Sequence, residues 1–237
     1  MSRVQMPLAL KPPRRPRFEN FVAGENSALV ASLRDGLESG EWYLLAGPGG
    51  SGRSHLLSAV LAARSQSGET ALFIALREAG QWPLLEQACA DWVILDDIDR
   101  LAGDAGGERL LFNALNRWRA ERSGVVMSAL GSGSFELPDL KSRLGQATRL
   151  TLNPLEEKGL AELVVRLAGE REVPLGRGVV DYLLSRTPRN AAQLARLVDH
   201  LADRALGERR TVSIPLVREL LDEQRVVQQG HAGTNEV

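Results

Sequence analysis

The chain has 237 residues, 43% of them hydrophobic, which is enough for one large domain or two small ones with a packed core. Its 29 basic and 30 acidic residues nearly cancel, and a pI of about 6.4 argues against a dominant non-specific nucleic-acid surface. A single cysteine, Cys89, argues against a disulfide framework and a thiolate metal site. No apolar run reaches the length of a membrane span, and the first residues lack the apolar core of a signal peptide. The sequence therefore predicts a cytoplasmic protein.

Residues 1–17 are rich in proline and arginine, so we expect a flexible leader outside the core. Within this leader, Gln5 is followed by Leu8 and Leu10. The pattern is similar to the short peptides with which bacterial proteins dock into the sliding clamp of the replicase. Gln5 would then hydrogen-bond at the rim of a pocket while the two leucines fill its apolar floor. A leader that binds no partner is the alternative.

A glycine-rich loop at residues 47–52 follows a predicted buried strand (42–46) and precedes a predicted helix (53–64). The loop fits the phosphate-binding pattern G-x-x-x-x-G-K-[ST], except that Arg53 replaces the lysine. Glycines let backbone N–H groups converge on an anion, and the helix N-terminus adds partial positive charge. The alternative is a glycine turn that binds no ligand. For His55, which follows Ser54, the alternative is a structural role. The candidate nucleotide contacts are Gly47, Pro48, Gly49, Gly50, Ser51, Gly52, Arg53, Ser54 and His55.

Arg53 keeps the positive charge of the usual lysine, but its guanidinium is planar and its side chain is longer. Such a side chain suits a β-phosphate and fits a γ-phosphate poorly in catalytic geometry. We therefore expect nucleotide binding with impaired or conditional hydrolysis.

A second motif, the Walker B pattern, consists of an apolar strand that ends in Asp96 and Asp97. Two adjacent acids at a strand end repel one another unless a cation is near, so this pair favours a functional role. We expect Asp96 to lie near Ser54, where the two would hold Mg²⁺, and Asp97 to polarise an attacking water.

The remaining pattern alternates strands and helices, which indicates a parallel sheet covered on both faces over residues 18–153. From residue 154 to 237 only helices are expected, which predicts a second, helical domain. Further strands are expected at 70–76, 124–130 and 148–152, helices at 27–36, 82–90, 108–122, 154–171, 178–186, 190–206 and 214–229, a short helix ending at Arg143, and a glycine loop at 103–107. Asn26 or Ser27 is the expected cap of the first helix.

Together, residues 47–54 and 93–97, Ser128, Arg143 and Arg189, followed by a small helical lid, resemble the AAA+ ATPases and, within them, the DnaA initiator group. Segments 112–116 and 137–144 are also similar to that group. The glutamine-leucine peptide and the arginine in the glycine loop most resemble the Hda family, regulators of initiator inactivation. The resemblance implies an α/β fold: an AAA+ P-loop base domain with a parallel sheet, followed by a small all-helical lid domain.

The resemblance also implies roles for three more residues. Ser128 takes the sensor 1 position beside the Walker B strand, Arg143 would be an arginine finger acting in trans, and Arg189 would be sensor 2, reaching from the lid to the phosphates. ADP or ATP is the implied cofactor, with Mg²⁺. The implied partners are DnaA and the sliding clamp, the beta subunit of DNA polymerase III. The helix-turn-helix domain of the initiators has no counterpart here, so no sequence-specific DNA binding is expected.

The expected function is regulation of replication initiation: the nucleotide-bound, clamp-tethered protein would stimulate ATP hydrolysis by DnaA and so inactivate it. An autonomous AAA+ ATPase, such as a helicase loader or remodeller, is the alternative, and a purely structural adaptor is a third interpretation. We expect weak or no ATPase activity of its own. The sequence leaves monomer and homo-oligomer open.

Overall fold

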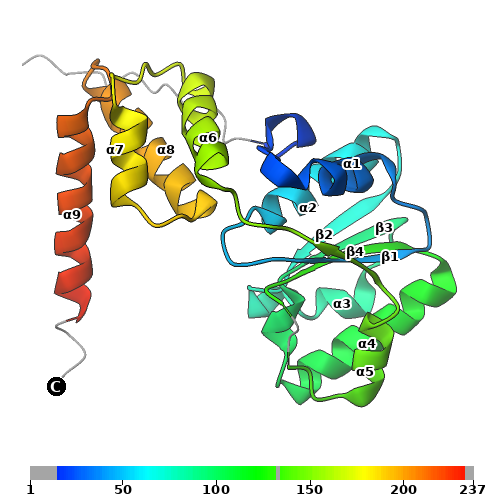
Figure 1. Cartoon of the computed structure of the whole chain (residues 1–237). Coiled ribbons are helices and arrows are strands. Elements are labelled where there is room, and N and C mark those ends of the chain that lie inside the picture. Colours follow the sequence, from blue (N-terminus) through cyan, green and yellow to red (C-terminus); the bar gives the residue numbers. More distant parts are fainter. Residues whose placement is uncertain (1–14, 132–133, 233–237) are drawn as a thin grey trace, which may run out of the picture.

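A computed structural model describes residues 15–131 and 134–232 (Figure 1). Five strands form one parallel sheet in the order β2-β3-β4-β1-β5. Their bounds are β1 Trp42–Ala46, β2 Ala71–Ala75, β3 Trp92–Asp96, β4 Gly124–Ala129 and β5 Thr148–Thr151. Gln5, Leu8 and Leu10 of the expected clamp peptide lie outside the described residues.

Helices cover both faces of the sheet, and a group of helices follows it (Figure 1). On one face lie α1 (Ser27–Asp35) and α2 (Arg53–Gln66), and on the other α3 (Leu84–Gln87), α4 (Ala105–Glu121) and α5 (Pro138–Leu144). The C-terminal group consists of α6 (Glu157–Glu170), α7 (Val179–Arg186), α8 (Ala191–Gly207) and α9 (Ile214–Ala232). This confirms the predicted sheet with a helical region after it.

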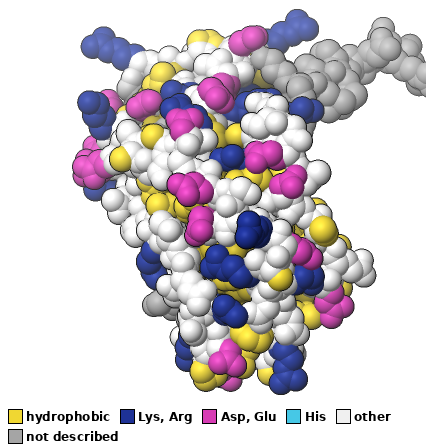
Figure 2. All heavy atoms as spheres, turned by 90° about the vertical axis from the view of Figure 1, so that its right-hand side faces the viewer, with side chains coloured by type: hydrophobic (Ala, Val, Ile, Leu, Met, Phe, Trp, Pro, Cys, Tyr) yellow, Lys and Arg dark blue, Asp and Glu magenta, His cyan; other side chains and the backbone are white. Residues whose placement is uncertain are grey.

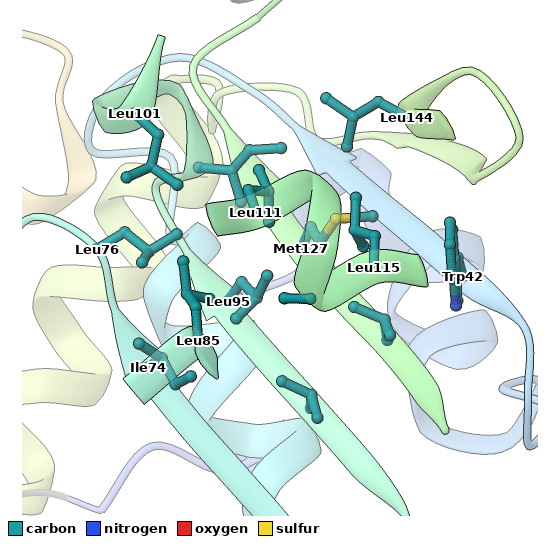
Figure 3. Close-up of a cluster of buried hydrophobic side chains, with 14 of the residues drawn as sticks. Trp42, Ile74, Leu76, Leu85, Leu95, Leu101, Leu111, Leu115, Met127 and Leu144 are labelled. Atoms are coloured by element: carbon teal, nitrogen blue, oxygen red, sulfur yellow. The ribbon is translucent and has the colours of Figure 1, made fainter. Parts of the chain in front are cut away.

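The sheet is buried on both faces because successive side chains of its strands point to opposite sides. In β1, Trp42 and Leu44 belong to the core cluster under α4, whereas Tyr43 and Leu45 belong to the cluster under α2. Figure 3 shows the first cluster, with Met127 of β4 near side chains of α4. Most apolar residues of the central strands therefore belong to one core or the other, which explains their nearly continuous apolar sequence.

The C-terminal helices have a core of their own, built largely from leucine and valine of α6, α7, α8 and α9. Two hydrogen bonds hold the chain where it leaves the sheet towards these helices: Asn26 donates to the carbonyl oxygen of Asn153 at 3.0 Å, and Asn153 N–H donates to Asn26 Oδ1 at 2.8 Å. Asn26 is the N-cap residue of α1, as predicted, but its side chain joins these two segments and makes no capping hydrogen bond to the helix.

Two other local predictions differ from the structure. The expected loop at 103–107 is shorter, because the side chain of Asp104 accepts a hydrogen bond from Gly107 N–H at 2.7 Å and so starts α4 at Ala105. The expected helix at 82–90 is reduced to the four residues of α3. Pro83 is its N-cap and Ala88 after it is extended, so the apolar spacing there continues no further as helix.

Figure 2 shows the face of the molecule that lies on the right in Figure 1. Basic and acidic side chains are mixed over this face, and hydrophobic side chains appear only in small, separate spots. This face therefore offers neither a field of one sign nor a large apolar patch. Among the described helices, none has the length and apolar character needed to cross a membrane.

Candidate functional site

A cavity of about 700 Å³ lies between the sheet domain and the C-terminal helices. Its floor is the glycine loop, from Gly49 to His55, at the carboxyl end of β1. Ligands of open parallel sheets bind at the carboxyl ends of the strands, so the position is that expected for a substrate or cofactor site. Its walls come from the segment before α1, the residues after β2 and β3, and α6 and α8: Pro16, Asn20, Phe21, Val22, Arg77, Asp97, Arg100, Leu163, Leu167, Asn190 and Arg196, among others.

The glycine loop has the conformation of an anion cradle. Gly50 and Gly52 have φ values of +81° and +104°, which other residues rarely adopt. A Cβ at Gly52 would lie 2.7 Å from the ring of Phe21. The N–H groups of Gly49, Gly50 and Gly52 donate to no other described residue, and the buried hydroxyl of Ser51 has no partner among them. The loop and the N-terminus of α2 thus leave donors available for a negatively charged group.

Asp96 is held by two serine hydroxyls. Ser54 Oγ donates to Asp96 Oδ2 at 2.6 Å, and Ser128 Oγ donates to Asp96 Oδ1 at 2.6 Å. Ser128 also accepts from the N–H of Asp97 at 2.8 Å. Ser128 is fully buried and does not line the cavity, so its direct effect is to orient the two acids.

The protein supplies only part of the coordination sphere that a magnesium ion needs. Ser54 and Asp96 offer oxygen ligands, which Mg²⁺ prefers, and their side-chain oxygens already lie within hydrogen-bonding distance. No group of three or more acidic, histidine or cysteine side chains that could hold a metal occurs within residues 15–131 and 134–232. Phosphate oxygens and water would therefore have to complete the shell, which is the usual arrangement for Mg²⁺ at phosphate sites.

Asp97 lies between two arginines. Its Oδ1 accepts from Arg53 Nη2 at 2.9 Å and its Oδ2 from Arg77 Nη2 at 2.7 Å. The side chains of Asp97 and Arg53 are only 3% and 6% exposed, whereas that of Arg77 is 65% exposed. The hydrogen bond that Arg77 donates to Asp97 raises the pKa of Arg77 above its ordinary value. Both oxygens of the expected water-polarising residue are thus engaged by cations.

Arg53 has a guanidinium nitrogen that lacks a hydrogen-bond acceptor among the described residues. Its Nη1 is buried and donates to no described residue, although the side chain lines the cavity. A buried cationic N–H without an acceptor is costly. An anionic oxygen in the cavity would supply that acceptor, so this orphan donor fits a phosphate group.

Part of the cavity wall is apolar and includes Phe21, Val22, Leu163 and Leu167. Arg166 of α6 reaches across and donates to the carbonyl oxygen of Glu19 at 3.0 Å, which ties the lid to the segment containing Phe21. A cavity lined by apolar side chains and by four arginines suits a ligand with an aromatic ring and a polyanion.

His55 lies beside this wall. Its Nε2 is 3.0 Å from the carbonyl oxygen of Arg17, and its ring centroid is 5.3 Å from that of Phe21. Burial lowers the pKa of His55 below its ordinary value of 6.5, and it outweighs the opposite effects of the Arg17 hydrogen bond and the charge of Glu170. The folded protein therefore favours neutral histidine at this position.

The lowered pKa of His55 predicts a loss of stability in mild acid. Below pH about 6.5 the unfolded state takes up a proton that the folded state still excludes, so the free energy of unfolding falls with pH until the lower, folded-state pKa is passed. In His55→Gln, the free energy of unfolding measured with urea should depend less on pH between the folded-state and unfolded-state pKa values of His55. Above that pH range, the variant should show the same pH dependence as the wild type. His200→Gln, at an exposed position, is the matched control. Equal pH slopes for wild type and His55→Gln would contradict the assignment.

Arg189 does not reach the cavity, contrary to the prediction. Its side chain is 75% exposed and forms a salt bridge with Glu157 at 2.9 Å. The reason is its place in the chain: it precedes Asn190, the N-cap of α8, and projects outside the junction. Asn190 and Arg196 line the cavity from α8 instead.

Three further positions complete the comparison with the sequence. Gly47 and Pro48 belong to the loop but do not line the cavity, and Gly47 N–H donates to the carbonyl oxygen of Ala129 at 3.2 Å. Arg143 is half-buried in the last turn of α5, and no residue of α5 lines the cavity. The cavity is also lined by four polar residues that were not among the predicted site residues: Arg77, Arg100, Asn190 and Arg196. Arg77 had a signal, since it follows a predicted parallel strand and therefore shares the edge of the sheet that carries the glycine loop.

Comparison with known proteins agrees with this architecture. Residues 156–221 match the family model of the Hda lid domain. The structure is similar to domain III of the replication initiation protein DnaA from Thermotoga maritima, with a TM-score of 0.75 and 18% identity over 90% of this chain and 97% of that one. It is also similar to AMPPCP-bound DnaA from Aquifex aeolicus, with a TM-score of 0.66 and 19% identity over 80% and 65% of the two chains. A third similar structure is the RuvB Holliday junction branch migration motor of Thermotoga maritima, with a TM-score of 0.60 and 22% identity over 82% and 65%.

The fold of the parallel sheet and its flanking helices is similar to the AAA+ fold of these neighbours. The C-terminal helices coincide with the matched lid. The chain thus has the AAA+ fold, with a parallel-sheet base followed by an all-helical region, and residues 156–221 of that region match the Hda lid domain.

Proposed function

We propose that the chain binds ADP or ATP between base and lid and, in that form, regulates the initiation of chromosome replication by stimulating ATP hydrolysis on DnaA. The match of residues 156–221 to the Hda lid is the observation that carries the proposal. The cavity beneath that lid supports the nucleotide, and so does the AMPPCP found in a DnaA structure of the same fold. Because DnaA acts on the chromosome, a protein that regulates it would be located in the cytoplasm.

Basic side chains near the glycine loop support a ligand that carries phosphate. Four arginines (Arg53, Arg77, Arg100 and Arg196) and three acids (Asp97, Glu170 and Asp199) line the cavity, and Arg53 and Arg77 both pair with Asp97. The spare N–H groups of the loop add donors without adding charge. Ser54 and Asp96 would hold Mg²⁺, which when bound offsets negative charge on the phosphates. On the apolar part of the wall, Phe21 and the leucines of α6 would pack against the adenine ring.

The engagement of Asp97 by two arginines supports weak or absent hydrolysis by the chain itself. A residue that polarises water needs an oxygen directed at that water, and each Asp97 oxygen already accepts from a cation. Bound nucleotide would then act as a stabilising ligand. An autonomous ATPase or helicase loader requires turnover, so steady-state hydrolysis by the isolated chain distinguishes the two functions.

Residues 1–17, 18–153 and 154–237 would act as leader, nucleotide-binding base and lid. Gln5, Leu8 and Leu10 of the leader would tether the protein to the sliding clamp, the beta subunit of DNA polymerase III. Arg143 would reach the nucleotide of DnaA, since α5 and the chain's own cavity share no residue. In a homo-oligomer, Arg143 would in the same way reach the nucleotide of a neighbouring copy of this chain.

The proposal is tested by reconstitution of ATP-bound DnaA, clamp-loaded DNA and the purified chain with ADP. We expect the conversion of DnaA-bound ATP to ADP to accelerate only when all three are present. Gln5→Ala combined with Leu8→Ala should remove the stimulation and leave ADP binding intact. Acceleration that is the same without the clamp would contradict tethering, and no acceleration under any condition would contradict the function.

A further inference from the structure

Asn190 makes two side-chain hydrogen bonds at the junction of lid and base. Its Oδ1 accepts from Gln193 N–H at 3.0 Å and so caps α8. Its Nδ2 donates to the carbonyl oxygen of Gly49 in the phosphate loop at 2.9 Å. The two bonds together use both ends of the amide, so a side chain with two acceptors cannot make both.

The backbone of α8 repeats the contact. Ala192 N–H donates to the carbonyl oxygen of Gly50 at 3.2 Å. Gly50 has a φ of +81°, and a Cβ there would lie 2.2 Å from Asn190 Oδ1. The first turn of α8 therefore fits against the loop only because a glycine stands at this position.

Asn190 donates its hydrogen bond to the peptide group that joins Gly49 and Gly50. In a trans peptide the C=O and the N–H point in opposite directions, so the group whose carbonyl oxygen Asn190 holds directs the N–H of Gly50 away from Asn190. That N–H donates to no other described residue, and Gly50 lines the cavity. A phosphate oxygen at Gly50 N–H and the amide of Asn190 would thus polarise the two ends of one peptide group, and each bond would strengthen the other.

We infer that Asn190 is a positioning residue that couples phosphate in the loop to the position of the lid. The inference rests on the proposed binding of adenine nucleotide. Because coupling is reciprocal, closure of the lid through Asn190 raises nucleotide affinity by the same factor by which nucleotide favours closure. Arg189, which the sequence had suggested for this task, is paired with Glu157 on the surface.

Asn190→Asp separates coupling from helix capping. Aspartate still accepts from Gln193 N–H, but it sets an oxygen against the carbonyl oxygen of Gly49. Asp104→Asn is the matched control, since it makes the reverse exchange at the N-cap of α4, whose residues do not line the cavity. We expect the dissociation constant for ADP, measured by calorimetry, to rise about tenfold in Asn190→Asp and to stay within twofold in the control.

Hydrogen exchange supplies the second readout. ADP should slow exchange of the amides at residues 191–194 in the wild type and in Asp104→Asn but not in Asn190→Asp, while melting without nucleotide stays close to wild type in all three. Asn190→Ser, which retains a capping hydroxyl too short to reach Gly49, should behave in the same way and replaces Asn190→Asp if that variant does not fold. Wild-type ADP affinity and protection in either variant would overturn the inference. Wild-type protein that binds no ADP would contradict the proposed function itself.

Discussion

Replacement of Arg143 by alanine should remove nearly all stimulation of ATP hydrolysis by DnaA, while ADP binding and melting temperature stay at wild-type values. An arginine finger supplied by a partner accelerates hydrolysis by about 10³ to 10⁵-fold in other systems, because its guanidinium stabilises charge that develops on the transferred phosphoryl group. Within the described residues, the guanidinium of Arg143 forms no salt bridge or hydrogen bond, so its removal breaks no such contact. The rate of ADP formation on DnaA measures the effect.

Lys141→Ala is the control for Arg143→Ala. Lys141 is an exposed cation on the same short helix, so its removal changes the local charge equally. It should retain most of the stimulation, and Arg143→Lys should retain little, since an ammonium lacks the planar, forked geometry of a guanidinium. Equal losses for Lys141→Ala and Arg143→Ala would mean that α5 contributes only general positive charge, and full activity of Arg143→Ala would refute the finger.

Asp97→Asn should lower the free energy of unfolding by about 3 kcal/mol, the cost expected when a buried ion pair loses one partner. The loss falls on Arg53, whose guanidinium is almost fully buried and would remain charged without its carboxylate. Arg77 is mainly exposed and contributes little. Asparagine tolerates the left-handed backbone at this position (φ +60°), so the substitution tests charge and adds little backbone strain. Urea unfolding measures the change.

Two companions make the Asp97 result specific. Asp99→Asn, at the neighbouring acid that accepts from Leu130 N–H, should cost less than about 1 kcal/mol because that acid is not paired with a buried cation. Arg53→Met combined with Asp97→Asn removes both buried charges and should be more stable than Asp97→Asn alone. The prediction would be contradicted if the double variant lost as much free energy of unfolding as Arg53→Met and Asp97→Asn lose together when each is made alone. Such additivity would show that the ion pair is not the source of the effect.

The sheet and the loop were predictable because their signals are local. β1, the glycine loop and α2 follow one another in the sequence, and the apolar run that ends in Asp96 and Asp97 marks β3 without reference to any other segment. The resemblance to DnaA-related AAA+ proteins, and the helical lid that goes with it, rested on the same local motifs and is confirmed.

The contacts that close the site were not predictable in this way. Arg77 meets Asp97 across 20 residues, and Asn190 meets Gly49 across 141. The resemblance to AAA+ proteins implied a lid contact at Arg189, whereas in the structure the next residue, Asn190, contacts the glycine loop. Only the geometry of the helix start shows that the N-cap faces the loop and its predecessor faces outward.

Titration of the purified, monodisperse chain with ADP by isothermal calorimetry tests the central claim most directly. The account predicts saturable binding of one nucleotide per chain, and a rise in unfolding free energy of about 2.7 kcal/mol at a free ADP concentration one hundred times the dissociation constant. Absence of both heat and stabilisation for the folded protein, with ATP as well as ADP, would contradict it.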